Sequence, residues 1–200
     1  MVRLAPLLLS VTRTGSPSHT SSAELCCQFC GETVGKVPDA FASKEPCCVL
    51  CGLVQNLGRP RVDEEAQLIW LPELSQPALN ALTRRVHVNL RRHGERLDTG
   101  VPPSTAAGDL PTLYQAGQAL LARRGEAETR LGTSSPSALA DALLRLSPAG
   151  FKRRDVLLGG VRLLPMGKLF EAEGDIYPQI VDSWQCAETG SAAEKDGGPR

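Results

Sequence analysis

Aromatic residues and net charge are both scarce in this sequence. Phe, Trp and Tyr together make up 4% of the 200 residues, so the core must consist mainly of Leu, Ala and Val. Lys and Arg number 22, Asp and Glu also number 22, and the formal net charge is zero. The chain as a whole therefore has no electrostatic preference for nucleic acid or for a membrane surface.

Long apolar segments are also absent. No run approaches the roughly 20 apolar residues that a membrane-spanning helix needs. The run Leu4–Val11 has eight residues and includes Pro6, whereas a secretory signal has a longer apolar region and a small-residue cleavage site. We expect this run to form a first strand or a docked arm, and the protein to be cytoplasmic.

The clearest secondary-structure signal is a helix over residues 76–93. Ser75 is a suitable N-cap, and Pro77 lies in the first turn, where no amide donor is needed. Gly94 follows the last turn and ends the helix. Apolar residues recur inside it at helical spacing, at Leu79, Leu82, Val86 and Leu90.

Five further elements complete the expected secondary structure. Residues 67–71 are expected to form a short strand, and residues 110–124 a second helix. A third helix is expected to begin after the N-cap Ser135, with its apolar stripe ending at Leu146. Residues 155–165 are expected to be extended because paired glycines disfavour a helix, and a last helical stretch carries Ile176, Ile180 and Trp184.

Six of the seven cysteines lie in two short segments, "CCQFC" at 26–30 and "CCVLC" at 47–51. Each segment contains a C-x2-C pair, and seventeen residues separate the pairs. This is the spacing of a four-thiolate zinc site. Two residues between ligands allow one tight turn to aim both sulfurs at a metal about 2.3 Å away. The sequence therefore predicts one structural Zn²⁺ per chain, held by Cys27, Cys30, Cys48 and Cys51.

Other uses of these cysteines fit the pattern less well. Disulfides need an oxidising compartment, and a thioredoxin-type site would have a single C-x-x-C. Four thiolates leave no open coordination position for catalysis, whereas an iron–sulfur cluster remains an alternative occupant. Cys26 and Cys47 have no assigned role; they are either ordinary small buried residues or alternative ligands after a shift in register.

These features predict an α+β fold, in which a small treble-clef or zinc-knuckle module of the HNH type precedes a mainly helical region. We expect an N-terminal strand and linker over 1–24 and the zinc module with its following helix over 25–94. The helical C-terminal region would span 95–184, and residues 185–200 would form a disordered tail, since they lack core residues.

A resemblance to a known family rests on four stretches in a fixed order. They are "CCQFCGETVG", "CCVLCGLVQN", "LIWLPELSQPALNAL", and "RLLP" followed by a downstream Trp. Together they resemble the IcmJ (DotN) family, over about residues 24–184. Members of that family belong to the coupling complex of the Dot/Icm type IVB secretion system.

The resemblance implies a zinc-binding HNH-like module that serves as a scaffold and not as an enzyme. Such a protein would lie on the cytoplasmic side of the inner membrane, attached only through partner proteins. It would bind the C-terminal extension of the coupling ATPase and other subunits of the coupling complex, and would help to recruit substrates. The family's zinc ligands fall on the same four cysteines.

An HNH-type nuclease is the first alternative function. Such an enzyme needs a general-base histidine on the hairpin between the cysteine pairs. Residues 31–47 contain no His and no Asn, and Gly52 follows the second pair. His87 and Asn89 are about 200° apart on the helix, so they cannot share a metal. We expect them to be polar residues that face solvent, and the protein to lack catalytic activity.

A nucleic-acid-binding zinc protein is the second alternative. Its basis is a set of basic residues near the end of the first helix and before residue 155: Arg84, Arg85, Arg91, Arg92, Arg96, Lys152, Arg153 and Arg154. Acidic residues balance this charge over the whole chain, and aromatic residues for base stacking are few. We therefore expect these side chains to lie on solvated faces, with no direct nucleic-acid contact.

Overall fold

Two strands that are distant in sequence form the centre of the protein. In the computed structural model, β1 (Ala66–Trp70) pairs antiparallel with β2 (Val161–Pro165), and Leu68 lies opposite Leu163. The structure describes residues 26–38, 46–98, 100–104, 106 and 108–193, without the side chains of residues 155 and 186–193. Helices with small antiparallel sheets confirm the predicted α+β class.

Helices account for most of the remaining structure. They are α1 (Val49–Gln55), α2 (Val62–Glu65), α3 (Gln76–Arg92), α4 (Leu110–Ala122), α5 (Arg124–Leu131), α6 (Pro136–Leu144), α7 (Pro148–Lys152), α8 (Arg154–Leu157) and α9 (Tyr177–Ala193). A second small sheet pairs β3 (Phe170–Glu171) with β4 (Gly174–Asp175). In the described part of the chain, no helix combines the length and the apolar character needed to cross a membrane.

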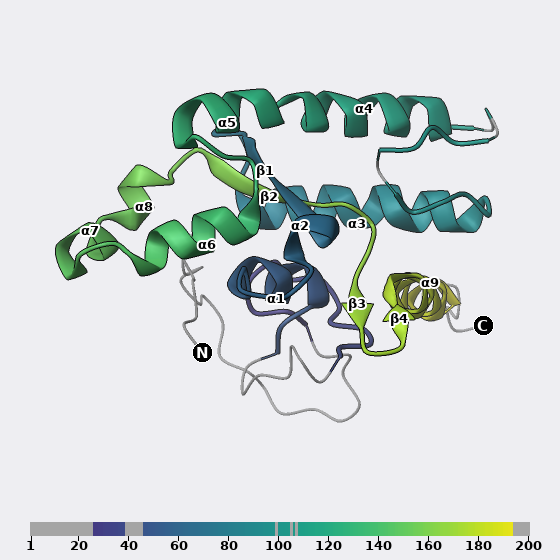
Figure 1. Cartoon of the computed structure of the whole chain (residues 1–200). Coiled ribbons are helices and arrows are strands. Elements are labelled where there is room, and N and C mark those ends of the chain that lie inside the picture. The colour runs from purple at the N-terminus through teal and green to yellow at the C-terminus, as the bar shows by residue number, and fades with distance from the viewer. Residues whose placement is uncertain (1–25, 39–45, 99, 105, 107, 194–200) are drawn as a thin grey trace.

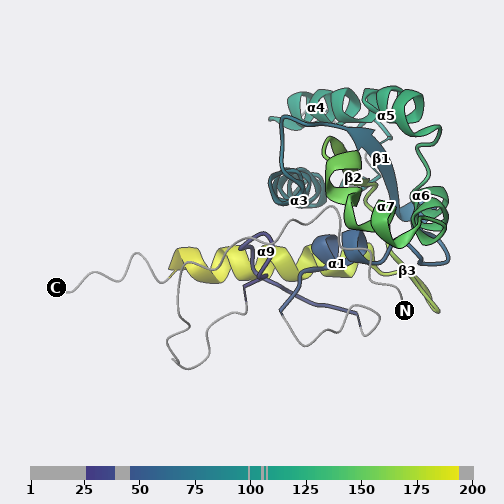
Figure 2. The same cartoon turned by 90° about the vertical axis from the view of Figure 1, so that its left-hand side faces the viewer.

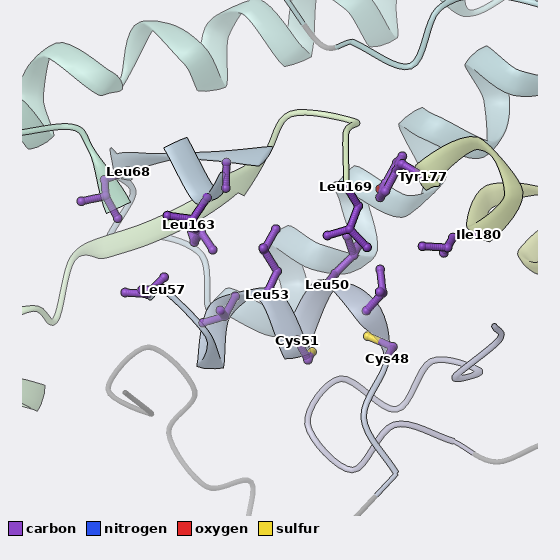
Figure 3. Packing of buried hydrophobic residues seen from close by; sticks show 14 of the residues in the cluster. Cys48, Leu50, Cys51, Leu53, Leu57, Leu68, Leu163, Leu169, Tyr177 and Ile180 are labelled. Atoms are coloured by element: carbon purple, nitrogen blue, oxygen red, sulfur yellow. The ribbon is translucent and has the colours of Figure 1, made fainter. Parts of the chain in front are cut away.

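The elements are arranged in three tiers. Helices α4 and α5 cover one side of the β1–β2 sheet, α3 and α6 flank the sheet, and α1 and α9 form the opposite side (Figure 1, Figure 2). Figure 3 shows Leu53 of α1 and Leu57, just after this helix, beneath Leu163 of β2. The main core extends from Cys27 to Trp184. The predicted zinc module and the predicted helical region therefore share one sheet and one core.

Helix α3 forms where the sequence predicts it. The Ser75 side chain accepts a hydrogen bond from the Ala78 amide at 3.3 Å, and Gly94, with φ of 71°, follows the helix. A left-handed residue there is easiest for glycine. Of the predicted apolar stripe, Leu79, Val86 and Leu90 are buried and Leu82 is half-buried. Polar residues of this helix are buried as well, because α3 contacts both β2 and α9.

Several predicted boundaries are wrong. The segment expected to be extended from 155 begins as helix α8, and the strand starts only at Val161. Gly160 lies between them, and a Cβ there would fall 2.4 Å from the Trp70 ring, so a glycine is required for this close approach. The apolar stripe predicted for the third helix is correct for two of its four residues. Leu139 and Leu143 are buried, whereas Ala142 and Leu146 are exposed.

The chain ends require a correction of another kind. Helix α9 continues to Ala193, so residues 185–193 are helical where the sequence predicted a disordered tail. Pro178 does not interrupt α9 because it lies in the first turn, where its missing amide has no partner to lose. The predictions for residues 1–24 and for the end of the tail, 194–200, concern residues outside those described.

Candidate metal centre

The first cysteine pair lies on a tight turn. The Gly31 amide donates to the Cys27 carbonyl at 2.8 Å, and the Cys27 amide donates to the Glu32 carbonyl at 2.8 Å. Gly31 has φ of 77°, a left-handed conformation that closes the turn at little steric cost for glycine. A bridge between Cys26 and Thr33 closes the base of the turn. Cys27 and Cys30 are thereby directed to the same side.

The second pair lies at the start of a helix. Cys48 is the extended N-cap residue of α1, and Cys51 falls in the first turn. Gly52 is an ordinary helical residue whose amide donates to the Cys48 carbonyl at 2.8 Å. Gly31 therefore adopts a turn conformation, whereas Gly52 continues the helix. A helical turn, in place of a second loop, positions the second pair.

The structure brings all four predicted ligands together. Their sulfur atoms lie within 4.8 Å of one another, and the Sγ atoms of Cys30 and Cys48 are 3.7 Å apart. A tetrahedral ion with metal–sulfur bonds of about 2.3 Å separates its sulfurs by about 3.8 Å. None of the six described cysteines forms a disulfide. The donor set and its spacing therefore fit a metal ion.

The protonation of these thiols depends strongly on their neighbours. Hydrogen bonds from Cys30 and the other nearby thiols lower the pKa of Cys27. Hydrogen bonds to the sulfurs of Cys27 and Cys30, followed by burial, raise the pKa of Cys51. Four thiolates at this distance need a cation to offset their repulsion, which couples metal binding to proton release.

The two extra cysteines differ from each other. Cys47 is buried, its thiol donates to the Cys48 carbonyl at 3.5 Å, and the Gln55 amide nitrogen lies 3.7 Å from its sulfur. A hydrogen bond to Cys27 and burial raise the pKa of Cys47. Cys26 is exposed. The expectation of a small buried residue is therefore confirmed for Cys47 and wrong for Cys26.

A chain of buried amides links the cysteine cluster to the central sheet. Gln76 exchanges two hydrogen bonds of 2.8 Å with the backbone of Leu163, and its amide nitrogen also donates to Asn80 at 2.9 Å. The Asn80 amide then donates to the Cys51 sulfur at 3.3 Å. Sequence reasoning missed this link. Its signal is the pair of amide residues at i and i+4 on an otherwise apolar helix face.

We predict that Asn80→Ala lowers metal affinity about ten- to hundredfold, the usual effect of removing a hydrogen-bond partner of a ligand. The lost donor would leave the charge on the Cys51 sulfur less stabilised. Competition against a chromophoric chelator would measure the change. Asn56→Ala is the matched control because Asn56 donates to the Gly52 carbonyl and not to a sulfur. Equal affinities for wild type and Asn80→Ala would contradict the assigned role.

Helix α9 holds the first cysteine turn in place. Gly35 has φ of 67°, and a Cβ there would lie 2.7 Å from the Trp184 ring, so only glycine allows the turn to approach this side chain. The Lys36 amide donates to Ser183 at 3.1 Å. Arg84 of α3 donates to the Thr33 carbonyl at 2.7 Å, and its guanidinium lies 4.8 Å from the Trp184 ring centroid. The downstream Trp therefore contacts the cysteine module directly.

These contacts correct the predicted solvated positions of two arginines. The side chain of Arg84 is 6% exposed, so it belongs to the interior and not to a basic surface. Arg91 forms two hydrogen bonds of 2.7 Å with Asp182 of α9. Both arginines tie α3 to neighbouring elements, which leaves less positive charge on this face than the sequence suggested.

His87 is likewise misplaced by the sequence prediction. It is fully buried, and its Nδ1 lies 2.7 Å from the Tyr177 hydroxyl. The Tyr177 ring in turn makes an edge-to-face contact with Trp184, with centroids 5.9 Å apart. Asn89 is also partly buried, and its Oδ1 has no hydrogen-bond partner among the described residues. The sequence therefore failed to predict the burial of His87 and the partial burial of Asn89.

Burial lowers the pKa of His87 from 6.5 to about 4. Because the unfolded chain takes up the proton at higher pH, the stability from neutral His87 is complete above pH 6.5 and is lost as the pH falls towards 4. By this linkage, protonation of His87 should lower the free energy of unfolding of the wild type by about 2 kcal/mol between neutral pH and about pH 5. The variant His87→Gln lacks the titrating group and should not show this loss. Urea unfolding of wild type and His87→Gln, each at neutral pH and at about pH 5, measures these changes in unfolding free energy. Any effect of metal release is common to both proteins and cancels when the two changes are subtracted. Equal pH dependence in both would contradict the prediction.

Comparison with known proteins gives no family assignment. No family model matches the chain, and no curated protein matches it either. The function of the protein is therefore inferred from the residues of this chain and from the resemblance of its motifs.

Proposed function

We propose that this protein is a non-catalytic, zinc-stabilised scaffold of a type IVB secretion or related conjugation coupling complex. The observation that carries the proposal is the cluster of four cysteine sulfurs within 4.8 Å of one another. A site made of four thiolates has no free position for water or substrate, which is typical of structural zinc. The bound ion would supply folding energy by joining the turn at Cys27 to the start of α1.

Zinc is the proposed ion because four thiolates in a tetrahedral arrangement favour zinc or iron–sulfur chemistry over harder cations. The distance of 3.7 Å between the Cys30 and Cys48 sulfurs fits a single ion of this kind. The cluster is also packed inside the main core, with Cys51 fully buried. A single structural Zn²⁺ per chain is therefore the proposed occupant.

The absence of catalysis is supported by the positions of the histidines. The segment 31–47 between the cysteine pairs contains none, and His87 is buried against Tyr177. His93 lies at the exposed end of α3, where its ring nitrogen bonds to the Asn89 carbonyl. The two described histidines, His87 and His93, therefore both have partners within the protein. These positions favour a scaffold over an HNH-type nuclease.

The proposed partners follow from the resemblance to the IcmJ (DotN) family. They are the C-terminal extension of the coupling ATPase and other coupling-complex subunits, with the protein peripheral to the inner membrane through them. In the distinctive stretch "IWLPELSQPALN", the apolar residues Ile69, Leu71 and Leu79 are buried together with Leu164. These residues therefore stabilise the junction of β1 and α3, and partner contacts must use other surfaces.

The test combines metal analysis with two binding assays. The purified protein should contain one zinc per chain by elemental analysis, and should co-purify with the C-terminal extension of the coupling ATPase from the same genome. A DNA-cleavage assay with Mg²⁺, Mn²⁺ and Zn²⁺ should show no activity. Stoichiometric zinc without ATPase binding would refute the scaffold role alone. Metal-dependent cleavage by the purified protein would support the nuclease instead.

A further inference from the structure

The exposed large apolar residues of the described chain are gathered in one place. They are Leu144, Leu146, Val156 and Leu157, and their exposed fractions range from 37% for Leu146 to 78% for Val156. All four belong to α6, α8 or the segment just after α6, at the left of Figure 1 and away from α9. Single exposed apolar residues are common on protein surfaces, but a cluster of them is typical of a binding surface.

A groove, here named the α6–α8 groove, lies within this cluster. It has a volume of about 180 Å³, and most of its wall consists of leucines from α6, α8 and the end of α5: Leu131, Leu139, Leu143, Leu146, Leu157 and Leu158. Pockets for small-molecule ligands usually measure about 300–1,000 Å³. This smaller, apolar groove is better suited to the anchoring side chains of a peptide.

The border of the groove is basic. Residues 142–154 contain Arg145, Lys152, Arg153 and Arg154, and no acidic residue. Arg145 lies 4.0 Å from the exposed Asp141, a weak surface contact. Among the described side chains, Lys152 and Arg153 are exposed and pair with no carboxylate, whereas Arg154 donates to the Phe151 carbonyl at 2.9 Å and lies over the Phe151 ring. A ligand with carboxylates beside its apolar anchors would therefore match both the groove and its border.

We propose that the α6–α8 groove binds an acidic, amphipathic helical segment of a partner protein. Aliphatic side chains on one face of that segment would fill the leucine-lined groove. Glu and Asp residues beside them would contact Lys152, Arg153 and Arg154. This assignment does not depend on the function proposed above, since it follows from the apolar surface and the charge at its border.

Two other occupants fit the charges less well. Residues 1–23 contain an apolar run but carry Arg3 and Arg13 and no acid, and the tail 194–200 has acids but no aliphatic residue. A second copy could offer only the same exposed cluster from its described surface, which would bring two basic borders together. Like charges facing each other at an interface are unfavourable. A separate acidic partner is therefore the occupant that these observations favour.

Fluorescence polarisation of two labelled synthetic peptides tests the proposal with the full-length protein. The first peptide carries Leu at helical i, i+3, i+4 and i+7 spacing with Glu elsewhere, and the second replaces every Glu with Lys. We expect the acidic peptide to bind at least about tenfold more tightly than the basic one. Leu157→Glu should weaken its binding about tenfold or more, as for a central interface residue. Arg153→Glu should weaken it about threefold or more, with a smaller dependence on salt.

Arg85→Glu is the matched control, because it reverses an exposed arginine on α3 and should leave peptide affinity unchanged. Metal content and melting temperature of each variant would show that the fold is retained. Three results would overturn the proposal: no binding of the acidic peptide at about 1 mM, the weakest affinity of interest; equal binding of both peptides; or no effect of Arg153→Glu. A dimer that Leu157→Glu dissociates, or acidic-peptide binding that appears only after residues 1–23 are deleted, would assign the groove to those other occupants.

Discussion

Cys48→Ser is expected to eliminate stoichiometric metal binding and to remove most of the stability of the fold. Structural zinc contributes on the order of 10 kcal/mol of apparent binding free energy, and whole domains are stable by about 5–15 kcal/mol. Cys48 is the N-cap of α1, and its sulfur is 3.7 Å from that of Cys30 on the other segment. Its loss would therefore separate the first cysteine turn from the helix.

The effect should extend beyond the cysteine module. Cys27, Cys48 and Cys51 belong to the same core as Leu68 and Leu163 of the central strands. Figure 3 shows Leu50 and Leu53 on the side of α1 that faces Leu169 and Leu163. If α1 loses its anchor, these leucines lose their position against the sheet. We expect insoluble protein or a strongly lowered melting temperature, measured with zinc content on the same preparation.

Cys26→Ser is the matched control for this prediction. Cys26 lies in the other doubled-cysteine segment, at 26–30, but it is exposed, and its sulfur is not among the four that cluster. The variant should keep one metal per chain and an unchanged melting temperature. If Cys48→Ser also kept both, the four-cysteine assignment would be wrong. Equal damage from the two variants would indicate that Cys26 is a ligand.

Local signals in the sequence predicted much of the secondary structure. Ser75 and Ser135 each accept a hydrogen bond from the amide three residues later, as their N-cap positions imply. The four clustered cysteines were also predictable, because two C-x2-C pairs define their own geometry. These features succeeded because each depends on a few neighbouring residues and needs no knowledge of the tertiary fold.

The failures share a tertiary cause. His87 and Arg84 were expected in solvent, but α9 covers their side of α3 and buries both. Periodicity in the sequence reveals the apolar face of a helix. It does not reveal another face that is buried against a second element, because polar residues on that face can have specific hydrogen-bond partners. Arg84 has the Thr33 carbonyl and the Trp184 ring, and His87 has Tyr177. Such partners are up to about a hundred residues away, so no local pattern reveals them.

Glu65 is the most consequential of these buried polar residues. Its side chain is 0% exposed and receives two hydrogen bonds from Arg59, at 2.8 and 3.0 Å. The Phe170 amide also donates to the Glu65 carboxylate at 2.8 Å, and Arg59 donates to the Phe170 carbonyl at 2.8 Å. The pair thus fixes β3 to the segment that leads into β1.

We predict that Glu65→Ala destabilises the protein by about 3–5 kcal/mol, the usual cost of leaving one buried charge without its partner. For a chain of this size, that corresponds to about 2–4 °C of melting temperature per kcal/mol. Arg59 would keep the Phe170 carbonyl and the more distant Glu171, at 3.7 Å, but would lose its buried carboxylate, and the Phe170 amide would lose its acceptor. Glu65→Gln should cost less, because the amide oxygen can still accept from Phe170. Thermal and urea unfolding would rank the two variants.

The control for this pair lies one residue earlier in the chain. Arg61 and Glu64 are 2.7 Å apart, slightly closer than Arg59 and Glu65, but both side chains are about half exposed. Water and salt screen such a pair, so Glu64→Ala should leave the melting temperature unchanged. Two ion pairs of nearly equal length would then differ because Glu65 is buried and also accepts from the Phe170 amide. Equal destabilisation by Glu64→Ala and Glu65→Ala would show that the contact distance, and not desolvation, governs the strength of these pairs.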